Sequence, residues 1–149
     1  MAVTTILTKQ TATLIYDLIN DANEIDIDAS ILSLSAPTVL SGDATGKNTS
    51  VVGTPLPGSG YKNTVRLTYD RLDMTVLLQK LVKQVVVPNL TQTTDVLSAF
   101  NEKYGFLLVA GDIVNESITS TGGTQSITVT MADSCPAFIG TFELTVSPS

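Results

Sequence analysis

The sequence predicts an α+β fold made of two related units, each a helix followed by an antiparallel hairpin, packed into one compact body. The first observation is a repeat. Residues 61–69 (Tyr-Lys-Asn-Thr-Val-Arg-Leu-Thr-Tyr) resemble residues 138–146 (Phe-Ile-Gly-Thr-Phe-Glu-Leu-Thr-Val) and are identical to them at three positions. Apolar side chains alternate in both copies, as they do in a strand with one buried face. The second observation is a helix-like segment upstream of each copy, at residues 14–21 and 96–102, so the order of helix and hairpin is repeated.

The first unit should occupy residues 11–74, after an N-terminal arm at residues 1–10. Its helix begins at a capping residue, Thr8 or Thr11, and runs to about Ala22. This prediction rests on apolar residues with the spacing of one buried helical stripe, namely Leu14, Ile15, Leu18, Ile19 and Ala22.

A hairpin should follow the first helix. Residues 41–50 are rich in Gly, Ser, Thr and Asn, which predicts an exposed loop. Pro57 presets the first position of a tight turn, and Gly58 accepts a positive φ at the next position. Strands at residues 51–56 and 61–70 should therefore pair across this turn.

Residues 75–91 form a predicted connector in which two patterns compete. Val85, Val86 and Val87 before Pro88 favour a strand, and the proline would end a helix. The preceding apolar residues instead fit a helical stripe, so we expect a short helix followed by a strand. The stripe consists of Met74, Leu77, Leu78, Leu81, Val82 and Val85.

The second unit should occupy residues 92–149. Thr93 or Thr94 is expected to cap its helix, Asp95 suits the first turn, and Gly105 suits the left-handed position that ends it. Its hairpin is expected to complete an antiparallel sheet from strands at residues 124–132 and 137–146.

The composition indicates a surface made mainly of hydroxyls and amides. Of 149 residues, 43% are hydrophobic and 15% are charged, against about 25% charged in an average soluble domain. Hydroxyls and amides can form new hydrogen bonds when a neighbour covers them, whereas buried charges are costly. Self-association and an extracellular β-rich domain both fit this composition.

The charges are unevenly distributed along the chain. A net charge of −6 argues against nucleic-acid binding. Residues 47–83 are nevertheless basic and residues 1–46 are acidic. These patches could orient one subunit against another, or they could pair within the subunit. The candidate interaction surface combines apolar residues of the arm with cations of the middle: Val3, Ile6, Leu7, Lys47, Lys62, Arg66 and Arg71.

Arg71 and Asp73 also follow the first copy of the repeat, where the second copy has no counterpart. They are candidates for a contact between the two units. The alternative is a local ion pair, which would contribute little to stability.

Residue types that commonly act in catalysis are scarce, so we expect that the protein is not an enzyme and binds no cofactor. The chain has no histidine, the commonest general base and metal ligand. Its single cysteine, Cys135, precedes a proline and is expected to be a partly buried apolar residue. Residues 21–28 only partly match a calcium loop, because Asp26 stands where glycine is required. Residues 46–49 (Gly-Lys-Asn-Thr) lack the hydroxyl directly after lysine that a phosphate-binding loop needs.

The sequence shows no sign of membrane insertion or secretion. Residues 1–14 lack the basic start and continuous apolar core of a secretory signal. No apolar stretch reaches the roughly 20 residues that a membrane helix requires. We expect a soluble chain, made in the cytoplasm, that has no membrane partner.

Several motifs together resemble those of uncharacterised virion structural proteins of large tailed bacteriophages. The resemblance covers the chain from about Leu18 onward, and residues 106–109 (Phe-Leu-Leu-Val) depart from the small polar residue usual there. The motifs are residues 40–43 (Leu-Ser-Gly-Asp), 48–49 (Asn-Thr), 56–61 (Leu-Pro-Gly-Ser-Gly-Tyr), 69–74 (Tyr-Asp-Arg-Leu-Asp-Met), 101–105 (Asn-Glu-Lys-Tyr-Gly) and 110–113 (Ala-Gly-Asp-Ile).

The resemblance implies a non-enzymatic component of the virion, synthesised in the host cytoplasm. Its partners would be other virion proteins, either capsid or tail subunits, and it would form a homo-oligomer on the particle. We favour a capsid decoration or accessory head subunit, because a small single body suits addition to a preformed shell. A tail or baseplate component fits as well. A receptor-binding or adhesion module using the loops at residues 41–50 and 117–123 is a second hypothesis, from a different class, and an enzyme that uses carboxylates is a third.

Overall fold

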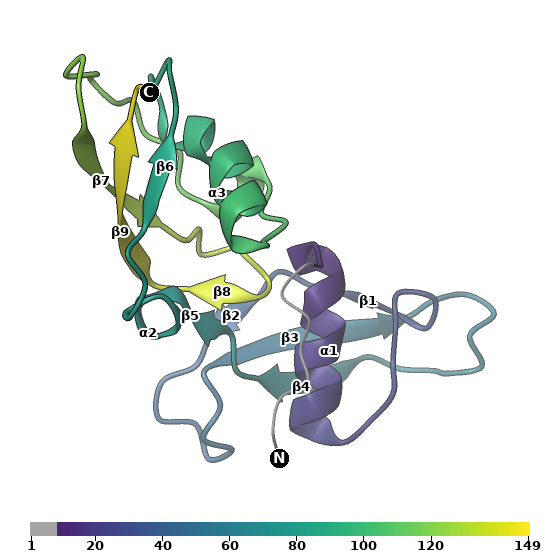
Figure 1. Ribbon diagram of the computed structural model, residues 1–149. Helices are drawn as coiled ribbons and strands as arrows, with labels where there is room; N and C mark the ends of the chain where they lie inside the picture. Colours follow the sequence, from purple (N-terminus) through teal and green to yellow (C-terminus); the bar gives the residue numbers. More distant parts are fainter. Residues whose placement is uncertain (1–8) are drawn as a thin grey trace.

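The computed structural model describes residues 9–149 and has an α+β fold, with 23% helix and 29% strand. Two groups of strands, each with a helix against it, lie side by side (Figure 1). The first group belongs to the N-terminal half of the chain and the second to the C-terminal half. The expected α+β class is confirmed.

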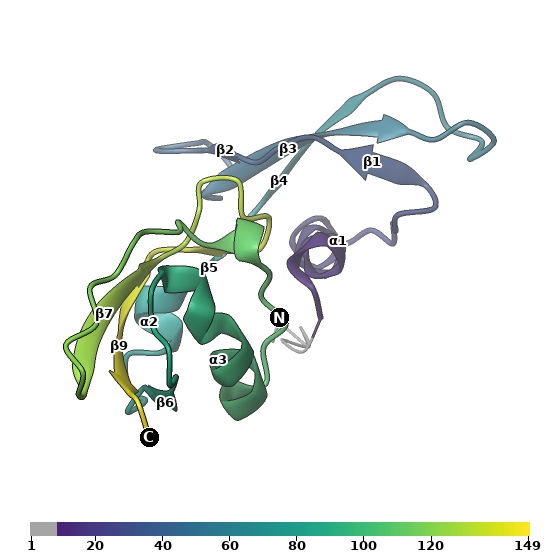
Figure 2. The same ribbon diagram turned by 90° about the horizontal axis from the view of Figure 1, so that it is seen from above.

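The N-terminal half is one helix on a four-stranded antiparallel sheet. Helix α1 (Thr11–Asn23) buries the predicted stripe of Leu14, Ile15, Leu18 and Ile19. The central strand, β3 (Thr49–Pro55), pairs with β4 (Val65–Tyr69) at one edge. At its other edge β3 pairs with two short strands, β1 (Leu32–Leu34) and β2 (Thr38–Val39). The connection between β3 and β4 projects away from the C-terminal half (Figure 2).

The C-terminal half is built around β9 (Thr141–Ser147). Strand β7 (Gln125–Thr130) pairs with β9 in antiparallel register, and β6 (Gln84–Val86) pairs with its other edge in parallel register. The expected antiparallel sheet is therefore wrong for β6. The register follows from the connection, because the chain leaves β6 and crosses over a helix before it reaches β9. The helical elements are α2 (Met74–Leu77), η1 (Thr93–Val96), α3 (Leu97–Tyr104) and η2 (Ala110–Asp112).

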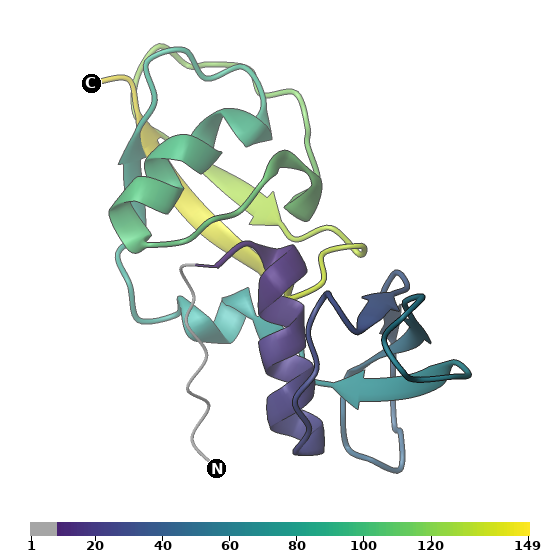
Figure 3. The ribbon, with the colours of Figure 1, turned by 90° about the vertical axis from the view of Figure 1, so that its right-hand side faces the viewer.

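A small parallel pair joins the two halves. Strand β5 (Leu72–Asp73) pairs with β8 (Phe138–Ile139), where the end of the first sheet meets the start of the second (Figures 1 and 3). The buried apolar side chains of both halves form one continuous cluster, which includes Tyr69 and Phe138. The predicted connector is also part of the fold, because it supplies α2 and β6.

The predicted burial of alternating apolar residues holds at all four positions of the C-terminal copy, including Phe138 of β8, but at only two of the four positions of the N-terminal copy. Phe142, Leu144 and Val146 of β9 are buried, as are Leu67 and Tyr69 of β4. In the N-terminal copy Val65 is 42% exposed and Tyr61 is 63% exposed. Both lie at or beyond the start of β4, where the hairpin extends past the helix that covers it.

The predicted helix caps are partly wrong. Gln10 is the N-cap of α1 and makes no side-chain capping bond, while the Thr11 hydroxyl donates to Asp112 Oδ1 at 2.7 Å. Thr8 lies outside the described residues. Gln92, not Thr93 or Thr94, precedes η1, where a capping box forms. The predicted stop at Gly105 is confirmed, with φ of 75° in the left-handed region.

Candidate interaction surfaces

The structure separates the predicted interaction residues. Lys47 and Arg66 form exposed ion pairs within the N-terminal half, to Asp70 at 3.6 Å and to Asp43 at 3.3 Å. Lys62 is exposed on the loop before β4. Two of the six cations at residues 47–83 are thus in ion pairs inside the subunit. Three further predicted residues, Val3, Ile6 and Leu7, lie outside the described residues.

Arg71 is not a surface residue, which corrects its prediction as part of an interaction surface. Only 3% of it is exposed. Its Nε donates to Thr49 Oγ1 at 2.9 Å, and one terminal nitrogen donates to the carbonyls of Asp133 at 2.8 Å and Cys135 at 3.0 Å. Because those carbonyls belong to the C-terminal half, the guanidinium instead fills the second predicted role, a contact between the halves.

The same junction buries two further polar side chains. The Tyr69 hydroxyl donates to the Pro136 carbonyl at 2.7 Å, and burial raises the pKa of that phenol. Cys135 is fully buried, and its burial raises the pKa of the thiol to about 11. A thiol in that state is not a nucleophile near neutral pH. The junction is therefore structural.

The most exposed apolar surface lies on the connector. We call it the connector strip, and define it as Val76, Leu77, Leu81, Val82 and Val86. These side chains are 59%, 40%, 46%, 77% and 54% exposed, respectively. Isolated exposed apolar residues are common on proteins, but five within eleven consecutive residues concentrate exposed apolar side chains on one segment of the chain.

The connector strip carries only positive charge. Between Met74 and Thr94 the charged residues are Lys80 and Lys83. Lys83 Nζ donates to the carbonyls of Leu78 and Leu81 at 3.1 Å each, which holds the turn between α2 and β6. Lys80 is exposed. A partner for this surface would be apolar with acidic or neutral polar groups around it.

Sequence reasoning missed the connector strip because its pattern resembles a buried helix. The predicted stripe is split in the structure: Met74, Leu78 and Val85 are buried, whereas Leu77, Leu81 and Val82 are exposed. Helix α2 ends at Leu77, so the stripe does not continue along one helical face. A signal was present in the sequence, since an apolar run with no acidic residue is unusual in a chain of net charge −6.

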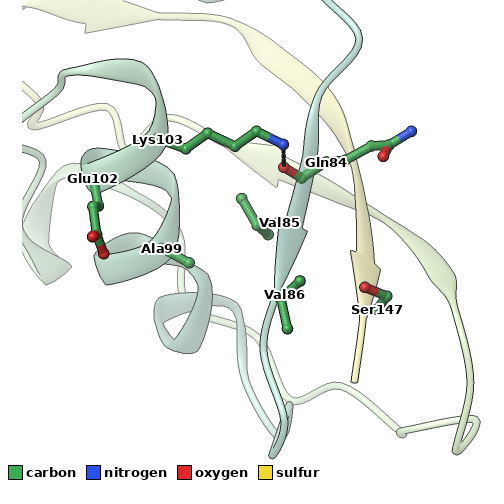
Figure 4. A pocket seen from close by; sticks show the side chains of 7 residues that line it. All are labelled: Gln84, Val85, Val86, Ala99, Glu102, Lys103 and Ser147. Carbon is green, nitrogen blue, oxygen red and sulfur yellow. Dashed lines mark hydrogen bonds between the residues drawn. The ribbon is translucent and has the colours of Figure 1, made fainter. Parts of the chain in front are cut away.

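A shallow cleft separates β6 from α3 beside the connector strip. Figure 4 shows Lys103 reaching from α3 to the Gln84 carbonyl, a hydrogen bond of 2.7 Å. The backbone N–H of Gln84 donates to the Tyr104 hydroxyl at 2.9 Å. The edge of β6 is thus already occupied at Gln84, and Pro88 follows it closely. These features protect the edge from pairing with another strand.

A second groove lies across one face of the N-terminal sheet and reaches from Leu32 of β1 and Pro55 of β3 to Val65 and Arg66 of β4. Its walls are the α1–β1 connection, with Ile25 and Asp26, and the loop before β4, with Tyr61 and Lys62. Ile25 is 40% exposed. The acidic run predicted at residues 21–28 lies beside this groove. Hydrogen bonds from Ser30 lower the pKa of Asp28 in this run.

The described part of the chain offers no centre for metal chemistry. Residues 9–149 contain no cluster of three or more His, Cys, Asp or Glu side chains that could hold an ion. Within the same range, no helix has the length and apolar character needed to cross a bilayer.

Comparison with known proteins identifies a family without assigning an activity. Residues 4–149 match a family of unknown function (DUF7941). The chain belongs to this family. No curated protein and no solved structure matches it significantly. Its function must therefore be inferred from its own surfaces.

Proposed function

We propose that this protein is a structural subunit of a tailed bacteriophage virion that binds neighbouring particle proteins through the connector strip. The observation that carries the proposal is the concentration of exposed Val and Leu side chains at residues 76–86. The motif resemblance supports the choice of particle. The proposed role is binding, with no reaction assigned to the protein.

The connector strip is large enough to matter energetically. Completely burying one exposed Val or Leu side chain contributes about 1.5–3 kcal/mol. The five side chains are already about half buried, so covering them would contribute roughly 4–7 kcal/mol before association costs are subtracted. That fits a contact that is weak in isolation. Repetition over many sites on a particle would make such a contact effectively permanent.

We further propose that the two halves are versions of one helix-and-hairpin unit. In each half a helix packs near the second strand of an antiparallel hairpin: α1 on β4, and α3 beside β9 through stacked rings of Phe100 and Phe142, 5.1 Å apart. The two second strands, β4 and β9, coincide with the sequence repeat. Such a doubled unit suits a building block.

Within the virion we favour a capsid decoration or accessory head position over a tail or baseplate position. The reason is shape: the halves share one continuous core and form one body, and such a body can be added to a preformed shell. A receptor-binding module is the contrasting proposal. The projecting β3–β4 connection with its exposed Tyr61 favours it, because recognition residues often lie on such loops.

Uptake by particles tests the proposal. Virions prepared without the protein are mixed with the wild type, with Val82→Glu and with the control Val39→Glu, and bound protein is quantified per particle. Val39 is 65% exposed on β2, outside the connector strip. We expect saturable uptake for the wild type and control, and at least tenfold weaker uptake for Val82→Glu.

Equal uptake of Val82→Glu and the wild type would refute the connector strip as the binding surface. If the wild-type protein does not bind particles but binds host cells as a monomer, the structural role is refuted in favour of receptor binding. Electron microscopy of saturated particles then assigns the added mass to head, tail or baseplate.

A further inference from the structure

The free edge of β4 has unused backbone hydrogen-bonding groups. The Val52 carbonyl of β3 accepts a hydrogen bond from the backbone amide of Ser35, on the β1 side. The neighbouring residues Val51 and Gly53 therefore direct their backbone N–H and C=O groups to β4. Their partners in β4 are Leu67 and Val65. The residue between these partners, Arg66, must therefore turn its N–H and C=O away from β3.

One group on this edge is already bonded, which confirms its direction. Asn23 Nδ2, at the end of α1, donates to the Thr68 carbonyl at 2.8 Å. Among residues 9–149, the amide and carbonyl of Arg66 have no hydrogen-bond partner. Unlike β6, β4 carries no proline and no blocking side chain on Arg66's backbone groups. An open edge of this kind accepts another strand.

The groove beside the edge could hold the side chains of such a strand. Ile25, Tyr61 and Val65 are 40%, 63% and 42% exposed along its walls. Alternate side chains of an added strand point to opposite faces. One set would therefore enter the groove and cover these apolar groups.

We propose that this edge binds residues 1–8 of a neighbouring copy of the chain as an added β-strand. The segment reads Met-Ala-Val-Thr-Thr-Ile-Leu-Thr, without proline or a charged side chain, and five of its eight residues are β-branched. Such residues favour strands, and side chains without charge cost little to bury. This proposal rests on the proposed function, since it supplies a contact between adjacent subunits.

The geometry of α1 favours a neighbour's segment over the chain's own. Residue 9 lies at the N-terminal end of α1, where Thr11 contacts Asp112. The open edge of β4 lies near the other end of the helix, where Asn23 contacts Thr68. The 13 residues of α1 are about 20 Å long. Residues 1–8 span at most about 27 Å when extended. After returning along the helix, the chain's own segment would have too few residues left to pair along β4.

A proline substitution tests the edge without disturbing the subunit. Arg66→Pro removes the outward N–H but leaves the β3–β4 hydrogen bonds intact, because proline is tolerated where the amide faces away from the sheet. Arg66→Ala is the matched control, since it also loses the Asp43 ion pair but keeps the amide. A third variant lacks residues 2–8.

Two measurements follow from these variants. In sedimentation experiments over a concentration series, the wild type and Arg66→Ala should associate, whereas Arg66→Pro and the truncated variant should stay monomeric. A synthetic peptide of residues 1–8, labelled at its C-terminus, should bind the truncated variant. Its affinity should fall at least tenfold when the truncation is combined with Arg66→Pro.

The proposal is refuted if the truncated variant associates like the wild type, if the peptide fails to bind, or if Arg66→Ala is as impaired as Arg66→Pro. The wild type could instead be monomeric, with an Arg66 amide that is protected from hydrogen exchange and loses this protection when residues 2–8 are removed. That result would mean that the segment docks within its own chain, and it would also refute the proposal. None of these results depends on Val82, so particle uptake judges the proposed function separately.

Discussion

Replacing Arg71 with methionine should strongly destabilise the protein. The substitution keeps an unbranched side chain but removes three hydrogen bonds from a residue that is 3% exposed. Hydrogen bonds to a charged group contribute about 1.5–3 kcal/mol each, and the cost of burying the cation offsets part of that sum. We therefore expect a loss of about 3–5 kcal/mol in the free energy of unfolding, which corresponds to a lower Tm by roughly 10 °C for a chain of this size.

The assay is urea unfolding followed by circular dichroism, with Arg66→Met as the control. Arg66 is exposed and makes one bond of 3.3 Å to Asp43, so its replacement should cost less than about 1 kcal/mol. Arg71→Lys should fall between the two, because an ammonium lacks the planar fork that reaches Thr49 and both carbonyls. A loss below about 1 kcal/mol for Arg71→Met would refute the claim that this guanidinium joins the halves.

Three further predictions concern separate positions. Gly140→Ala should cost about 2–4 kcal/mol in denaturant unfolding, since φ is 91° and the new Cβ would clash with Asp73 Oδ1; Gly123→Ala, in open space, should be nearly neutral. Cys135 should resist Ellman's reagent at pH 8 until the protein is unfolded, and rapid labelling of the native chain would contradict its burial. Hydrogen bonds from Thr91 lower the pKa of Asp95, so its carboxylate stabilises the folded protein above the unfolded pKa of 3.8, and this stabilisation is lost as pH falls through the folded pKa. The urea midpoints of the wild type and Asp95→Asn should therefore converge on acidification from pH 6 to pH 2.5.

Local patterns in the sequence were sufficient to predict α1, α3 and both hairpins. The apolar stripe at Leu14 to Ile19 predicts α1 because it depends only on helical spacing, and Gly105 predicts the end of α3 because a positive φ is a local requirement. The turn at Pro57 likewise predicts a hairpin, although β4 begins four residues later than its predicted start at residue 61.

Features that depend on distant residues could not be predicted in this way. The acceptors of Arg71 are carbonyls more than 60 positions away, and backbone carbonyls carry no sequence signal. The parallel pairing of β6 with β9 depends on where the chain returns after α3. The connector strip escaped prediction because apolar residues give the same pattern whether a core or a partner covers them.

The position of β6 beside β9 also affects how the protein is made. During synthesis, β6 leaves the ribosome roughly 60 residues before the strand that must lie beside it. Closing so long a loop is slow, and neither the sheet nor the junction beyond it can be completed until β9 has been translated. An interrupted product would therefore expose its connector to chaperones and proteases, and only finished chains could reach the native fold.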